Sequence, residues 1–177
     1  MKKIIKLLVA ITFIVPSLTS LADTSIKADV VYGHKDGMAL VYDVITPGNA
    51  NGAAVVFMVS GGWYSRWSPP ESRVEQFSHF LDAGFTLIPV HHGSAPRYHV
   101  PDAYADVSRA IRHIKMHAGQ HGIDADRIGV TGGSAGGHLS LMLGLDSDQG
   151  DPNAREEVMR QSNDVAAIVA YVCWIAI

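Results

Sequence analysis

Short apolar runs alternate along this chain with segments in which apolar residues recur every three or four positions. Continuous apolar runs are typical of strands buried on both faces, and the longer spacing is typical of amphipathic helices. The alternation predicts an α/β fold, with a mostly parallel sheet flanked by helices. We expect its strands at residues 29–33, 39–45, 53–59, 85–90, 127–131 and 165–171, each of the later runs being buried.

Two strands carry further local signals. Lys35, Asp36 and Gly37 follow the run at 29–33 and predict a tight turn into the next strand. Pro89 lies inside the run at 85–90 and argues against a central position for that strand, because proline has no N–H group to donate to a neighbour.

The first helix is expected to begin directly after Ser68 and to end at Gly84. Ser68 is a suitable N-cap, Pro69 suits the first helical position, and Glu71 completes a capping box. Glycine is favoured just after the last turn of a helix. The apolar stripe of this helix consists of Val74, Phe77 and Leu81.

Further helices are expected after Pro101, over residues 135–145 and, as a short piece, around residues 156–160. On the helix after Pro101, Arg109, Arg112 and Lys115 lie largely away from the apolar face. That apolar face consists of Val107, Ala110, Ile111, Ile114 and Ala118.

The first 22 residues have the pattern of a secretory signal peptide. Lysines at positions 2, 3 and 6 precede a short apolar run at 7–15, and small residues precede the expected cleavage after Ala22. We therefore expect export by a Sec-type route to the periplasm or the medium, with a single α/β domain over residues 23–177. An uncleaved membrane anchor is the alternative, although the run is short for a membrane span.

The net charge and the cysteine content limit the classes of partner and cofactor that this chain can be expected to bind. Removing three lysines leaves 11 Lys and Arg against 17 Asp and Glu, so the formal charge falls from −3 to −6. This balance argues against nucleic acid and anionic membrane surfaces as partners. Cys173 is the single cysteine, which excludes an internal disulfide, and the sequence has no Cys/His cluster with zinc spacing. We expect no metal and no cofactor.

The segment Gly132-Gly133-Ser134-Ala135-Gly136 matches G-x-S-x-G between an expected strand and an expected helix. In this context the pattern predicts a nucleophile elbow, where a strained turn projects the serine hydroxyl and glycines allow close approach of strand and helix. The N–H of Ala135, at a helix N-terminus, would face developing negative charge. An ordinary turn or a phosphate loop is the alternative, but no G-K-[ST] follows.

A second glycine loop, Ser60-Gly61-Gly62-Trp63, directly follows the expected strand at 53–59. Glycines let backbone N–H groups turn toward a substrate oxygen, which is the requirement of an oxyanion hole. A plain Gly-Gly turn explains the segment equally well when it is taken alone. Together with the serine elbow, it favours acyl transfer.

These motifs, with His92–Arg97 and residues 122–128, resemble bacterial esterases of the hormone-sensitive-lipase and feruloyl-esterase-like groups. The resemblance runs from about Val30 to Tyr171. It implies the α/β-hydrolase fold, with Ser134 as nucleophile. By the same resemblance the oxyanion donors are Gly61, Gly62 and Ala135. The chain departs from the family's His-Gly-Gly-Gly pattern, because Val59 and Ser60 replace the histidine and the first glycine.

The same resemblance places the triad acid and histidine after two further strands, in that order. We therefore expect them beyond Ile177, with this chain an N-terminal portion truncated after about the sixth strand. His91, His92, His99 and His138 are expected to be structural or solvated. Asp102 and Asp106 are expected to cap or orient their helix.

We therefore predict a serine hydrolase of carboxylic esters, with a small-molecule ester as substrate and without stable membrane insertion. An amidase or peptidase is the nearest enzymatic alternative. A non-catalytic remnant or binding protein on a hydrolase scaffold is the other alternative. Four aromatic residues are candidates for lining the site or for ordinary packing. They are Trp63, Tyr64, Trp67 and Tyr98.

Overall fold

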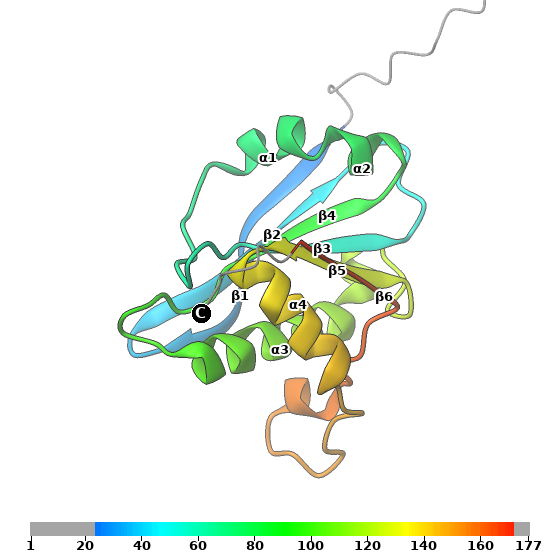
Figure 1. Cartoon of the computed structure of the whole chain (residues 1–177). Helices are drawn as coiled ribbons and strands as arrows, with labels where there is room; N and C mark the ends of the chain where they lie inside the picture. The colour runs from blue at the N-terminus through cyan, green and yellow to red at the C-terminus, as the bar shows by residue number, and fades with distance from the viewer. Residues whose placement is uncertain (1–23, 172–177) are drawn as a thin grey trace, which may run out of the picture.

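The computed structural model describes residues 24–171, so the predicted signal peptide (1–22) and Cys173 lie outside the described residues. One six-stranded sheet has the order β1-β2-β4-β3-β5-β6, with helices on both faces (Figure 1). The strands are β1 (Ser25–Lys35), β2 (Met38–Thr46), β3 (Ala54–Met58), β4 (Thr86–Val90), β5 (Ile128–Gly133) and β6 (Ala167–Tyr171). The helices are α1 (Pro70–Gln76), α2 (Ser78–Asp82), α3 (Val100–Met116), η2 (Ala118–His121), α4 (Ala135–Leu145) and η3 (Glu157–Arg160).

The sheet is mostly parallel, as predicted. β4, β3, β5 and β6 run parallel, whereas β1, β2 and β4 pair antiparallel. Pro89 does occupy a central strand, where it lies beside Phe57 of β3. The two pairs between β2 and β4 join Tyr42 to Val90 and Ile45 to Leu87, so Pro89 lies in a gap of that ladder. This gap removes the objection that a central strand must use every N–H group.

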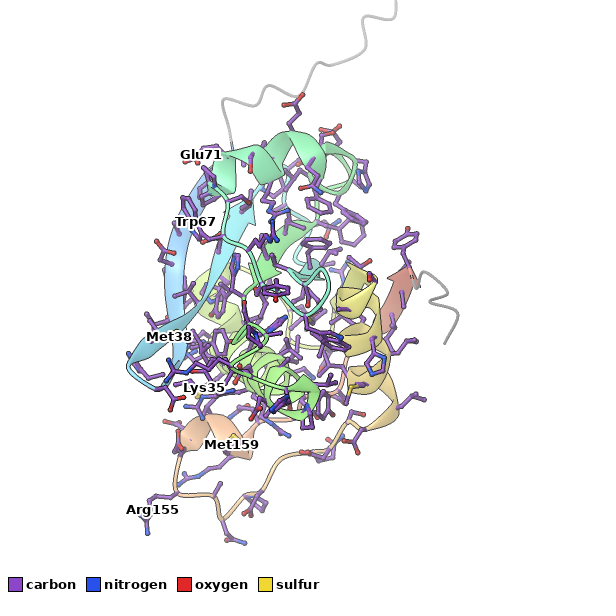
Figure 2. All side chains as sticks on the ribbon, turned by 60° about the vertical axis from the view of Figure 1, so that its left-hand side comes forward. Lys35, Met38, Trp67, Glu71, Arg155 and Met159 are labelled. Atoms are coloured by element: carbon purple, nitrogen blue, oxygen red, sulfur yellow. The ribbon has the colours of Figure 1, made fainter. Side chains whose placement is uncertain are left out.

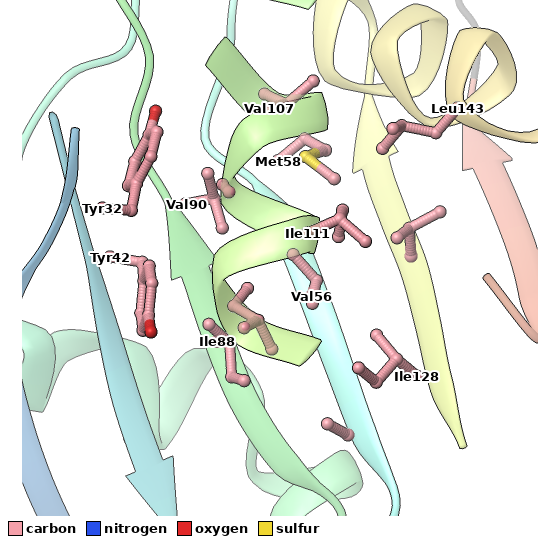
Figure 3. Packing of buried hydrophobic residues seen from close by; sticks show 14 of the residues in the cluster. Tyr32, Tyr42, Val56, Met58, Ile88, Val90, Val107, Ile111, Ile128 and Leu143 are labelled. Carbon is pink, nitrogen blue, oxygen red and sulfur yellow. The ribbon is translucent and has the colours of Figure 1, made fainter. Parts of the chain in front are cut away.

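Two apolar clusters fix the layers of the fold. On one face, Val56 and Met58 of β3 pack under Val107 and Ile111 of α3, with Leu143 of α4 beside them (Figure 3). On the other face, Val55 and Leu87 of the sheet pack against Val74, Phe77 and Leu81 of α1, α2 and the residue between them. Because successive strand residues point to opposite faces, a sheet covered on both sides needs continuous apolar runs.

The predicted helix over 68–84 is two short helices, and its predicted capping box is wrong. Pro69 adopts an extended conformation (ψ 133°) because a residue followed by proline is driven out of the helical region, so α1 can begin only at Pro70. The hydroxyl of Ser68 is buried without a hydrogen-bond partner among the described residues. The helical conformation is interrupted again at Phe77, between α1 and α2. Gly84 follows α2 with φ +82°, as a helix end favours.

The polar segment after α4 folds back over α3 and covers Arg112, which lies away from the apolar face of that helix. This side chain is buried, and its guanidinium donates to Asp148 at 2.6 Å and to the carbonyl of Gln161. Arg109 forms a 2.7 Å ion pair with Glu156 in the same segment. The helical pattern placed Arg112 away from the apolar face, but a second layer of chain covers that side as well.

β6 is exposed rather than buried. Within residues 24–171 it has a neighbour, β5, on one side only, and Val169 and Tyr171 are 52% and 68% exposed. An apolar run therefore identified the strand correctly but not its burial. No helix among the described residues is long and apolar enough to cross a membrane.

Candidate active site

Ser134 stands between the last residue of β5 and the first residue of α4. Its backbone has φ 53° and ψ −120°, which is a strained conformation for a residue with a side chain. Its N–H donates to the carbonyl of Tyr171 at 2.8 Å, so the neighbouring strand β6 holds the turn. The predicted strand–turn–helix context of the serine is confirmed.

The glycines two residues either side of Ser134 are required by space. A Cβ on Gly132 would lie 2.5 Å from the carbonyl carbon of Gly136, and a Cβ on Gly136 would lie 2.5 Å from the carbonyl oxygen of Met58. A Cβ on Gly133 would meet nothing within 4 Å. Close approach of β5, α4 and β3 therefore explains the glycines at both ends of the motif.

The second glycine loop forms a tight turn from Gly61 to Tyr64. The two residues exchange backbone hydrogen bonds of 3.1 Å, and the central residues Gly62 and Trp63 have φ +57° and +68°. The N–H of Gly61 is therefore engaged with the carbonyl of Tyr64. Among residues 24–171, neither the N–H of Gly62 nor that of Ala135 donates a hydrogen bond.

Ser60 joins this loop to the elbow. Its carbonyl accepts the N–H of Gly136 at 3.2 Å, and its hydroxyl lies 2.8 Å from Nε2 of His92. Nδ1 of His92 lies 2.8 Å from the carbonyl of Gly93, which can only accept, so Nδ1 carries the proton and Nε2 accepts from Ser60. Burial lowers the pKa of His92, which favours this neutral form.

The remaining polar groups near the loop after β4 form hydrogen bonds and an ion pair that stabilise this loop. Nδ1 of His91 lies 3.2 Å from the hydroxyl of Ser65, and burial lowers the pKa of His91 to about 4. The carboxylate of Asp106 is buried, forms a 2.5 Å ion pair with Lys35 and accepts the N–H of Gly93 at 2.9 Å.

A hydrogen bond also joins His99 and Asp102 at the start of α3. Asp102 accepts the N–H of His99 at 2.9 Å and so caps the helix.

The described residues bring no base to the nucleophile. The ring of His138, one turn along α4, packs edge-on against Trp63 with centroids 5.4 Å apart. No hydrogen bond of the Ser134 hydroxyl is present among residues 24–171. The same residues contain no group of three or more His, Cys, Asp or Glu side chains arranged to hold a metal.

Comparison with known proteins agrees with this geometry. The family model BD-FAE matches residues 42–176. The chain belongs to the BD-FAE family. It is 36% identical over 93 residues to the probable carboxylic ester hydrolase LipM of Mycobacterium tuberculosis, a match that covers 52% of this chain and 22% of LipM.

Two solved structures similar to this BD-FAE chain carry the name esterase. Thermogutta terrifontis esterase 2 phosphonylated by cyclosarin is 27% identical, with a TM-score of 0.63 over 84% of this chain and 56% of that one. A truncated carbohydrate esterase from gut microbiota has a TM-score of 0.69 at 23% identity, over 85% of this chain and 57% of that one. This chain thus spans less than a third of the curated relatives it matches and a little over half of these esterases.

The four candidate aromatic residues do not form one site in this BD-FAE member. Trp67 and Tyr98 line a cavity of about 310 Å³ beside β2. Tyr64 lines a separate cavity that begins at Gly61, and Trp63 packs on His138. That second cavity also contains Arg66 and Arg73, which no sequence pattern singled out.

Proposed function

We propose that the protein carrying this chain hydrolyses carboxylic esters through an acyl-enzyme on Ser134. The observation that carries the proposal is the backbone of Ser134, held at φ 53° and ψ −120° between β5 and the N-terminus of α4. Strained backbone of this kind is retained where function needs it, and in a nucleophile elbow such a turn projects the serine hydroxyl from the sheet. The esterase relatives support the same chemistry.

Each bond change has a place in the site. The hydroxyl oxygen of Ser134 attacks the ester carbonyl carbon while a base takes its proton, and the carbonyl oxygen becomes an oxyanion. The N–H groups of Gly62 and Ala135 hold that oxyanion, and Gly61 adds a third donor when its bond to Tyr64 opens. Collapse expels the alcohol, and water then releases the acid and restores the hydroxyl. Loss of one donor slows such reactions about 100-fold to 1000-fold.

The base and its acid partner belong, in this proposal, to residues C-terminal to Ile177. The histidines that precede the serine support this placement, because His91 and His92 are bonded to Ser65 and Ser60. In this fold the acid and the histidine follow the nucleophile along the chain. Residues 1–22 serve as a cleaved export signal that brings the enzyme to the periplasm or the medium, so the mature protein begins at Asp23.

The test compares p-nitrophenyl butyrate hydrolysis by the protein expressed from its complete coding sequence with that of Ser134→Ala. We expect the substitution to lower kcat about a thousandfold or more. Ser72→Ala is the matched control, because Ser72 is exposed on α1 and its hydroxyl bonds only the nearby carbonyl of Pro69. An unchanged rate in Ser134→Ala would contradict the proposal.

Two further readouts separate the alternatives. Faster cleavage of butyryl p-nitroanilide than of the ester would favour an amidase or peptidase. Absence of any hydrolysis, together with no labelling of Ser134 by a fluorophosphonate, would favour a binding protein on a hydrolase scaffold.

A further inference from the structure

A cavity of about 370 Å³ opens directly beside the oxyanion loop. Its wall contains Ser60, Gly61 and Tyr64 of the oxyanion loop together with Arg73 of α1. A Cβ built on Gly61 meets nothing within 4 Å, so the loop presents open space toward this cavity. A substrate whose carbonyl oxygen reaches the N–H groups of this loop therefore has room for a further group here.

Two guanidinium groups line this cavity, those of Arg66 and Arg73, and we call them the arginine pair. Arg66 lies over the ring of Tyr64, with 5.9 Å between its guanidinium carbon and the ring centroid, and Arg73 lies over the ring of Phe57 at 5.5 Å. Both rings belong to the same cavity wall. Stacking on an aromatic face fixes a guanidinium plane and leaves its N–H edge available for a ligand.

Among residues 24–171 the arginine pair has no carboxylate partner, which is also true of Arg127, Arg155 and Arg160, but only the arginine pair lines this cavity. Arg97, Arg109 and Arg112 each form an ion pair with an acidic side chain. Among residues 24–171, neither Arg66 nor Arg73 has an acidic oxygen within 4 Å, and no acidic residue lines the cavity.

Nearby groups leave most of the donors of Arg73 unused. One nitrogen donates to Gln76 at 2.8 Å. Burial lowers the pKa of Arg73, and the nearby carboxylate of Asp43 opposes that shift. Asp43 is itself buried, accepts the N–H of Asp29 at 2.9 Å and does not line the cavity. Unpaired guanidinium groups at the wall of an open cavity attract an anion, and their planar donors match a carboxylate.

We propose that the arginine pair binds a carboxylate carried by the ester substrate, so that the preferred substrates are monoesters of dicarboxylic acids or comparable ester acids. This inference rests on the proposed ester hydrolysis at Ser134 and adds the charge of the substrate to it. The carbonyl lies at Gly62 and Ala135 while the carboxylate lies between Arg66 and Arg73. The arginine pair binds and orients the substrate and takes no part in bond changes.

The test compares monoethyl adipate with diethyl adipate, which differ by one negative charge. We expect kcat/KM to favour monoethyl adipate about tenfold at low salt, and the preference to shrink as NaCl rises from about 0.01 M to about 1 M. Arg66→Gln is expected to lower kcat/KM for monoethyl adipate about tenfold and to leave diethyl adipate unchanged. Arg73→Lys keeps a cation over Phe57 but loses the fork of donors, and is expected to act in the same direction.

Arg155→Gln is the matched control for the loss of one charge. Arg155 is exposed on the polar segment, at the opposite end of the molecule from Trp67 and Glu71 (Figure 2). The substitution Arg155→Gln is expected to leave kcat/KM unchanged for both monoethyl adipate and diethyl adipate. A preference for monoethyl adipate that survives in both variants of the arginine pair would overturn the assignment to these two residues.

A second readout needs no catalysis. Phenylglyoxal modifies accessible arginines, and mass spectrometry of the protein expressed from its complete coding sequence locates the products. We expect adipate to protect Arg66 and Arg73 and not Arg155. Hydrolysis of both esters without preference, together with no protection, would overturn the carboxylate site and leave ester hydrolysis standing. Protection by adipate without hydrolysis of either ester would support the carboxylate site and count against the proposed function.

Discussion

The hydroxyl of Ser60 donates a 2.8 Å hydrogen bond to Nε2 of His92, across a junction between the oxyanion loop and the loop after β4. The carbonyl of Ser60 accepts the N–H of Gly136 on the elbow helix at 3.2 Å. One residue thus connects three segments of the candidate active site. The resemblance to the His-Gly-Gly-Gly pattern implies a glycine at this position, and a glycine has no hydroxyl to bond His92.

Replacing Ser60 by alanine is expected to lower the free energy of unfolding by about 1–3 kcal/mol, because it leaves the buried Nε2 of His92 without a donor. Urea unfolding followed by tryptophan fluorescence measures the change. Ser68→Ala is the matched control, since the buried hydroxyl of Ser68 has no partner within the described part of the chain and its removal should cost nothing. Equal losses in the two variants would show that the bond to His92 has no special weight.

Gly136→Ala is expected to destabilise the elbow by about 1–3 kcal/mol, because the added Cβ would lie 2.5 Å from the carbonyl oxygen of Met58 and backbone cannot yield cheaply. Gly133→Ala, three positions earlier, adds the same methyl group where nothing lies within 4 Å, and it should change stability little. Thermal unfolding of both variants checks the contrast. Similar melting temperatures would mean that β3 and α4 lie further apart than the structure has them.

Asp106→Asn is expected to destabilise the protein by about 2 kcal/mol or more, because it breaks an ion pair with Lys35 at a carboxylate that is only 5% exposed. The amide oxygen can still accept the N–H of Gly93, so the loop is not wholly released. Asp36→Asn is the comparison. Asp36 and its partner Arg97 are 54% and 62% exposed, and exposed pairs contribute at most about 1 kcal/mol. Urea unfolding at low salt should separate the two, and equal effects would contradict a buried role for Asp106.

Stability is expected to fall on acidification through His113 and His121, which both bond the hydroxyl of Tyr42. Burial lowers the pKa of each from 6.5 to about 4. Both rings are therefore neutral in the folded protein at pH 7, whereas the unfolded chain takes up protons below about pH 6.5. The contribution is full above that pH and is lost as pH falls toward 4.

Melting temperatures between pH 7 and pH 4.5 test this dependence. His113→Gln should make the profile shallower but not flat, because it removes one of the histidines whose pKa burial lowers and leaves His121, His91 and His92 in place. His34→Gln, at an exposed position on β1, should leave it unchanged. A wild-type profile that is flat across this range would contradict the assignment.

Local sequence patterns were sufficient for the strands and most helices. The spacing of apolar residues follows from the geometry of a helix or a strand, so it is visible in any short window. Where the prediction for the helix after Ser68 was wrong, the signal was still local. Pro69 precedes Pro70 and cannot adopt a helical conformation easily, which moves the helix start beyond the reach of Ser68.

The nucleophile elbow could also be predicted from the sequence, whereas the contacts around it could not. A tight turn at Ser134 requires glycine at positions 132 and 136, so the pattern that identifies the turn spans only five residues. Ser60 and His92 are separated by 32 positions, and the arginine pair meets the oxyanion loop only because α1 packs over the end of β3. No short window contains these relationships.

The succession of strands and helices and the serine at the turn follow from local patterns, because backbone geometry imposes those patterns residue by residue. Which polar groups are buried and paired depends instead on contacts between distant segments. Arg112 lies on the polar side of its helix and is nevertheless buried, because Asp148 and Gln161 arrive from a segment that folds back over it. Burial and pairing depend on how distant segments pack, and that packing sets the protonation of His92 and the open cavity beside Gly61.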